Sequence, residues 1–95
     1  MSNKVKLGDK EYVVKYLKLG AAKKIVKAKE EKKLDNLDYN THILAEAINY
    51  SNPDAKMTIE KFDDSIDIVE FGEIQKKILE YSGLDKYFNV GIGKK

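Results

Sequence analysis

The chain has 95 residues and a formal net charge of +2 at pH 7, and its eighteen basic side chains are all lysines. It contains no cysteine, which excludes disulfides, thiolate nucleophiles and zinc–thiolate sites. The absence of arginine removes the side chain best suited to holding phosphate or guanine through two parallel hydrogen bonds.

A chain of this length forms one domain. We expect that domain over residues 1–86, followed by a flexible tail over residues 87–95. The N-terminus lacks the apolar stretch of a secretory signal, and no apolar run is long enough to span a membrane. The sequence therefore predicts a cytoplasmic protein without a membrane segment.

A β-hairpin is predicted over residues 3–17. Val5 and Leu7 alternate with lysines, as in a strand with one buried face. Gly8 and Asp9 then supply a tight turn, because glycine readily takes the positive φ that hairpin turns require. A two-stranded hairpin is marginal alone, so its apolar face must pack on helices.

Four helices are expected after the hairpin, over residues 20–33, 38–51, 58–64 and 67–82. The first has Leu19, Ala22 and Ile25 on one side and lysines on the other. The second carries Ile43, Leu44, Ala47 and Ile48 at helical spacing, and Asp38 or Asn40 can cap it.

Local signals mark the last two helices. Thr58 is placed to cap the third helix, and Asp67 with Glu70 fits a capping box at the start of the fourth. Gly83 is a suitable C-terminal cap for that helix. The fold class is therefore α+β, with an N-terminal β-hairpin packed on a compact body of three to four helices.

The charges are divided along the chain. Residues 1–33 hold eleven lysines and four carboxylates, whereas residues 34–85 hold four lysines and twelve carboxylates. Such a chain has two regions of opposite sign, which suits docking onto other proteins or onto copies of itself.

Residues that perform chemistry are nearly absent. His42 is the only histidine, has no partner at catalytic or metal-ligand spacing, and is interpreted as a surface residue. The acidic group from Asp63 to Glu73 fails the EF-hand pattern, because Ile68 stands where a glycine is needed. We expect no enzyme activity, no cofactor and no metal site.

The lysine-rich helix allows three interpretations. A solvated helix face is favoured first, an acidic protein partner second, and nucleic acid last, because arginine is absent and Glu30 and Glu31 interrupt the lysines. Six tyrosines can pack at the edge of the core or contact a partner. The partner-binding surface is predicted at Tyr12, Tyr16, Lys23, Lys24, Lys27, Tyr87 and Phe88.

The order of elements is distinctive. It comprises a hairpin (4–14), a lysine-rich helix, a helix with Ile43, Leu44 and Ile48, a turn (57–64), a capping box (67–70), and a last helix ending at Tyr81-Ser82-Gly83-Leu84. This order resembles that of tail assembly chaperones of long-tailed phages and prophages of Gram-positive bacteria.

The resemblance implies a small non-enzymatic protein of the bacterial host cytoplasm. It would bind the tape-measure protein, cover the apolar faces of that protein, and recruit tail-tube subunits, with self-association also possible. The alternative functions are a small nucleic-acid-binding regulator that uses the lysine-rich helix, and an enzyme subunit or inhibitor.

Overall fold

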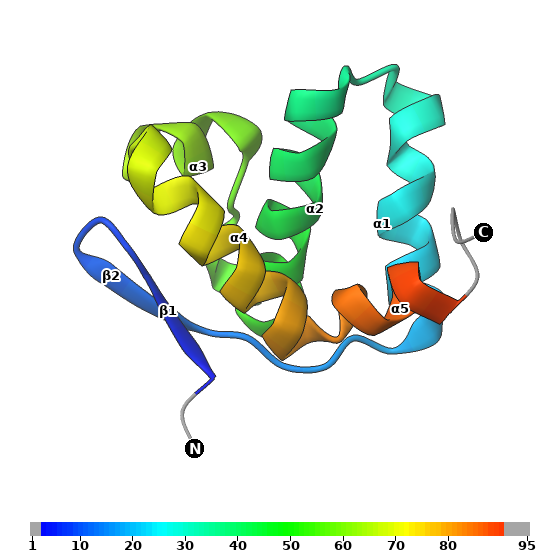
Figure 1. Ribbon diagram of the computed structural model, residues 1–95, viewed down its shortest axis with the longest axis horizontal. Coiled ribbons are helices and arrows are strands. Elements are labelled where there is room, and N and C mark those ends of the chain that lie inside the picture. Colours follow the sequence, from blue (N-terminus) through cyan, green and yellow to red (C-terminus); the bar gives the residue numbers. More distant parts are fainter. Residues whose placement is uncertain (1–2, 91–95) are drawn as a thin grey trace.

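The computed structural model describes residues 3–90, except for the side chains of Lys29 and of residues 88–90. Its elements are β1 (Lys4–Leu7), β2 (Lys10–Val13), α1 (Leu19–Lys32), α2 (Asn36–Ser51), a short 3-10 helix (Pro53–Ala55), α3 (Ile59–Ser65), α4 (Ile68–Ser82) and α5 (Leu84–Val90). Figure 1 shows the antiparallel hairpin against a compact group of helices. The predicted α+β class is confirmed, with one helix more than expected.

The hairpin turns at the residues that the sequence indicated. Val5 pairs with Tyr12 and Leu7 with Lys10, so that Gly8 and Asp9 form the two-residue turn. Gly8 has φ of 63°, a conformation that costs glycine little because it has no Cβ. Alternation along β1 buries Val5 and Leu7 and leaves the intervening lysine exposed.

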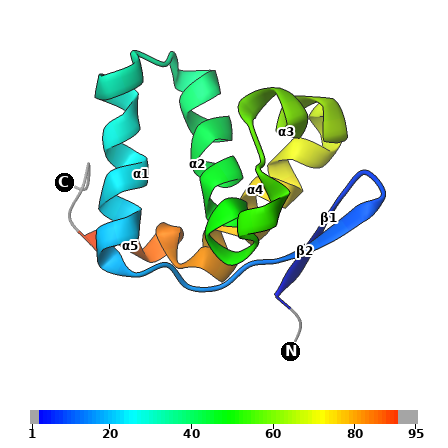
Figure 2. The same cartoon turned by 180° about the vertical axis from the view of Figure 1, so that it is seen from behind.

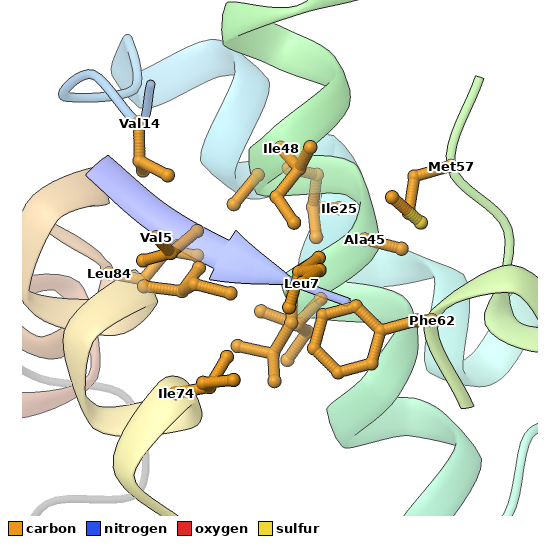
Figure 3. Close-up of a cluster of buried hydrophobic side chains, with 14 of the residues drawn as sticks. Val5, Leu7, Val14, Ile25, Ala45, Ile48, Met57, Phe62, Ile74 and Leu84 are labelled. Atoms are coloured by element: carbon orange, nitrogen blue, oxygen red, sulfur yellow. The ribbon is translucent and has the colours of Figure 1, made fainter. Parts of the chain in front are cut away.

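Helix α2 is the centre of the fold. It contacts α1, α3, α4, β2 and the 3-10 helix, and Figures 1 and 2 show it between α1 on one side and α3 with α4 on the other. Its residues from Thr41 to Ala45 are all buried, as are Ala47 and Ile48. The core seen in Figure 3 brings together side chains of the hairpin and of every helix from α1 to α5.

The helix caps follow the sequence at α3 and α4. The Thr58 hydroxyl accepts a hydrogen bond from the Lys61 backbone N–H, at 3.1 Å. At α4 the Asp67 Oδ1 accepts from Glu70 N at 2.8 Å, and the Glu70 Oε1 accepts from Asp67 N at 3.1 Å, which completes the capping box.

The start of α2 differs from the prediction. Asp35, not Asp38 or Asn40, caps the helix, and its Oδ1 accepts from Asp38 N at 2.8 Å. Lys33 ends α1 in a left-handed conformation with φ of 53°. The connection between α1 and α2 is therefore short. Asp35 is the first acidic side chain in it, and it caps α2.

A linker of residues 14–18 replaces the last residues of the predicted hairpin (3–17), because β2 ends at Val13. Hydrogen bonds hold its backbone against the C-terminal ends of α2 and α4. Lys15 N donates to Ser51 Oγ at 2.8 Å, and Leu17 N donates to the Ser82 carbonyl oxygen at 2.9 Å. Lys18 N also donates to the Tyr50 hydroxyl at 3.4 Å. The linker therefore runs across the ends of α2 and α4 as a fixed segment.

The predicted tail is partly helical. Gly83 ends α4 with φ of 83°, as expected, but the chain then forms α5 from Leu84 to Val90. Leu84 lies in the core, and the half-buried Tyr87 packs against the core one helical turn later. The tail predicted from residue 87 thus begins inside α5, and residues 91–95 lie outside the described part of the chain.

The interpretation of His42 as a surface residue was wrong, because only 7% of its surface is exposed. Its helix is covered on several sides, which leaves no solvated face at this position. Burial lowers the pKa of His42, Glu46 opposes that effect and Lys32 adds to it.

None of the described helices is long and apolar enough to cross a membrane.

The lowered pKa of His42 predicts a pH-dependent stability. The unfolded chain binds a proton near the ordinary pKa of 6.5 and the folded chain only at lower pH, so the free energy of unfolding should fall as pH drops below 6.5. Urea unfolding of the wild type and of His42→Gln, measured from neutral pH down to the range where carboxylates titrate, checks this. The slope should be lost in His42→Gln, and an unchanged slope would contradict the assignment.

Candidate functional site

An open apolar groove of about 580 Å³ lies where the linker, the start of α1 and α5 meet. Figures 1 and 2 both show α5 beside the first turns of α1. The lining comes from the linker (Tyr16, Leu17), from α1 (Leu19, Ala22, Lys23) and from the α4–α5 junction (Ser82, Gly83, Leu84, Lys86, Tyr87).

The α4–α5 junction has its polar groups satisfied within the chain. Ser82 is buried; its hydroxyl donates to the Leu79 oxygen at 3.3 Å and accepts from Leu84 N at the same distance. The Ser82 carbonyl accepts from Leu17 N, as described above. This side of the groove therefore offers mainly apolar surface to a ligand.

Tyr16 forms a wall of the groove because the linker fixes its backbone. The neighbouring residues Lys15 and Leu17 both donate backbone hydrogen bonds, to Ser51 and Ser82. A Cβ atom placed on Gly83 would lie 3.2 Å from Tyr16 Cδ1, so the ring sits close over this glycine. The side chain nevertheless remains 75% exposed, which leaves its outer part free to contact a partner.

Leu19 is a large apolar side chain that the fold leaves in solvent. The sequence placed it on the apolar side of α1 with Ala22 and Ile25, and these two are buried, but Leu19 is 60% exposed. It is the first residue of α1 and lines the groove instead of the core. Together with Tyr16 it gives the groove exposed apolar surface that a monomer has no use for.

Lysines border the groove. Lys23 and Lys86 are among its lining residues, and Lys15 and Lys18 lie exposed in the linker. Between Glu11 and Glu30 the sequence has six lysines and no carboxylate. Asp85 adds one carboxylate at α5, where its Oδ1 accepts from Lys86 N at 2.7 Å. The charged side chains that line the groove are therefore lysines, while the rest of its lining is mainly apolar.

Three of the predicted site residues meet here: Tyr16, Lys23 and Tyr87 line the same groove. Lys24 and Lys27 are exposed on α1 but do not line it, and Tyr12 lies on the hairpin, half-buried against the core. The side chain of Phe88 lies outside the described part of the chain.

The sequence did not single out Leu17, Leu19, Ala22 or Leu84 as site residues. Each fits an apolar helix or strand pattern, so only the fold separates a groove position from a core position. Lys86 was missed as well, because the tail was expected to begin beside it. A usable signal was the spacing of Leu84 and Tyr87, three residues apart, which is typical of one face of a helix.

Metal binding finds no support in the described residues, which contain no group of three or more histidine and acidic side chains able to hold an ion. Asp38 of α2 and Asp64 of α3 instead repel Asp63 of α3. Burial raises the pKa of Asp63, as do the neighbouring charges of Asp38 and Asp64, while a hydrogen bond from Thr41 lowers it.

No protein-family model, curated protein or solved structure matches this chain.

The close contact between Gly83 and Tyr16 predicts a cost for adding a methyl group there. Gly83→Ala places a Cβ at φ of 83° and 3.2 Å from the Tyr16 ring, so we expect a loss of about 1 kcal/mol in the free energy of unfolding. Gly72→Ala in the exposed interior of α4 is the matched control. Its Cβ meets nothing within 4 Å, so it should gain about 0.5–1 kcal/mol. Urea unfolding measures both, and equal changes would contradict the contact.

Proposed function

We propose that this protein is a non-enzymatic binding domain that holds an apolar segment of a protein partner in the groove beside α5. In its specific form the proposal is a tail assembly chaperone of a long-tailed phage or prophage, which binds the tape-measure protein and recruits tail-tube subunits. The order of elements along the sequence suggests this family, and the groove supplies a surface suited to the task.

The observation that supports binding most strongly is the exposure of Tyr16 and Leu19 beside an apolar cavity. Exposed aromatic and aliphatic side chains around a pocket are typical of protein contacts, where they bury their surface against a partner. The polar groups of Ser82 are already bonded within the chain, which favours an apolar ligand over a polar metabolite.

The lysines of the groove indicate the charge of the partner. Lys23 and Lys86, which line it, would attract an apolar segment flanked by carboxylates and orient it in the groove. An open groove of this size accommodates only a few side chains, which suits a contact that is released later. Reversible binding is what a chaperone requires, because it must leave when the tail tube closes around the tape-measure protein.

A nucleic-acid-binding regulator is the second candidate. The observation in its favour is the exposure of Lys23, Lys24 and Lys27 on α1. Such binding would weaken steeply with salt, because each lysine that meets a phosphate releases a counterion. A gel shift at low salt with double-stranded and single-stranded DNA tests it, and absence of any shift removes this candidate.

The groove predicts a specific loss of binding in Leu19→Glu. A carboxylate in the apolar groove must be desolvated when the partner binds and would repel acidic flanks, so affinity for the tape-measure protein of the same genome should fall at least tenfold, or about 1.4 kcal/mol. Biolayer interferometry with purified tape-measure protein measures the change.

Leu37→Glu is the matched control for that experiment. Leu37 stands in the first turn of α2 with 66% exposure, close to the 60% of Leu19, but lies outside the groove. The affinity of the Leu37→Glu variant for the tape-measure protein should be unchanged. Equal losses in both variants would exclude the groove as the contact surface, and no complex between the wild-type proteins at micromolar concentration would refute the chaperone function.

A further inference from the structure

A second apolar depression, of about 270 Å³, lies between α2 and α4, and we name it the α2–α4 pocket. Its walls come from α2 (Tyr39, Asn40, Ile43, Leu44) and from α4 (Gln75, Leu79). Ile43 and Leu44 belong to the core and are buried, so the pocket reaches down to core side chains. Its volume lies below the range of about 300 Å³ and more that is typical of small-molecule sites. The pocket therefore suits a single large side chain of a protein partner.

Gln75 contributes an unpaired acceptor to this pocket. Among the side chains that the structure describes, its Oε1 is the only buried nitrogen or oxygen without a hydrogen bond. Buried polar groups are almost always paired, because an unpaired one has lost its bonds to water and gained none. The amide of Asn49 shows the usual case, since it bonds both the N–H and the carbonyl of Met57. The carbonyl of Gln75 is thus an acceptor that the chain alone does not use.

An apolar side chain at position 75 would serve folding at least as well as glutamine. Gln75 stands one helical turn before Leu79, and the two side chains line the same wall of the α2–α4 pocket. Methionine has a similar length and helix propensity, and it brings no strongly polar atom that must be paired. The choice of glutamine therefore favours a contact that the isolated chain does not make.

The α2–α4 pocket lies next to the groove beside α5. Tyr87 lines the groove and Tyr39 lines the pocket. The two side chains are neighbours, because Tyr87 adds to the effect of burial in raising the pKa of Tyr39. Helix α5, which carries Tyr87, follows directly on α4, as Figure 1 shows. A segment that leaves the groove past Tyr87 therefore meets the α2–α4 pocket next.

We propose that Gln75 is a specificity-determining residue for the partner segment held in the groove. That segment extends past Tyr87 and Tyr39, places one apolar side chain in the α2–α4 pocket, and donates a hydrogen bond to Gln75 Oε1. The inference rests on the proposed function and adds a requirement to it. Besides an apolar stretch with acidic flanks, the partner needs a second apolar side chain with a hydrogen-bond donor beside it.

The donor is a neutral group, such as a hydroxyl or an amide. None of the described residues that line the α2–α4 pocket is charged, so an ammonium group would lose its water there without gaining a counter-ion. The last side-chain bond of glutamine has a broad torsional preference, which lets the Gln75 oxygen turn towards a donor in the pocket. Once the partner covers the pocket, a segment without the donor leaves this oxygen unpaired and binds more weakly.

Gln75→Met separates binding from stability. Loss of the unpaired oxygen should raise the urea midpoint of the free chain. Affinity for the tape-measure protein of the same genome should fall about fivefold, because one hydrogen bond to the partner is lost. Biolayer interferometry measures the affinity. Lys76→Met is the control, since it places the same side chain at the next, exposed position of α4, outside the pocket and the groove, and should change neither quantity.

Asn40→Glu tests the pocket itself. Asn40 is an exposed residue of α2 at the wall of the pocket, and a carboxylate there must lose water when the partner's apolar side chain enters. Affinity should fall about tenfold. Asn36→Glu adds the same charge one helical turn earlier, outside the pocket and the groove, and should leave the affinity unchanged. Circular dichroism and thermal melting show that both variants are folded.

Three outcomes would overturn the inference and leave the proposed function standing. Gln75→Met could bind as tightly as the wild type while Leu19→Glu loses affinity, which would exclude Gln75 from the contact. Equal losses in Asn40→Glu and Asn36→Glu would indicate a general effect of charge. A lower urea midpoint for Gln75→Met would show that the amide serves the folded chain. Absence of binding by the wild type would refute the proposed function, and this inference with it.

Discussion

The burial of α2 is the constraint on which the other elements depend. Its run of buried residues from Thr41 to Ala45, continued by Ala47 and Ile48, can be covered only if elements pack on several of its sides. The small side chains of Ala45 and Ala47 let neighbouring elements approach closely, while Leu44 and Ile48 fill the space between them. The short helices α3 and α5 are too short to be stable in water alone, so their position is a consequence of packing on the rest of the molecule.

The linker connects the groove to this packed core through backbone hydrogen bonds. Its hydrogen bonds go to Ser51 at the end of α2 and to Ser82 at the end of α4, two helix ends that packing in the core already holds in place. The Asn52 side chain adds a further link, since its Nδ2 donates to the Val13 oxygen at 2.8 Å and to the Ile48 oxygen at 2.9 Å. A fixed backbone on both sides of Tyr16 explains how an exposed ring can keep a defined place beside Gly83.

Features encoded within a few residues could be predicted from the sequence. The caps at Thr58 and Asp67, the turn at Gly8 and the end of α4 at Gly83 each depend on neighbours no more than three residues away. The start of α2 was predicted less well, because several side chains can cap and the length of the preceding turn decides between them. The burial of His42 and the groove depend on segments far apart in the sequence, and periodicity carries no information on which of these meet.

The same reasoning explains why charge separation along the chain becomes charge separation in space. The lysine-rich segment consists of the linker and α1, which border the groove, whereas several of the acidic residues stand in the caps and first turns of α2, α3 and α4. Carboxylates at helix starts are favourable because they face the positive end of the helix dipole, so these residues cost each helix little. What local folding does not explain is the presence of Ile68 and Val69 among those carboxylates and of Tyr16 and Leu19 among the lysines. These four side chains are largely exposed in the folded chain, and contact with another macromolecule is the role that we propose for them.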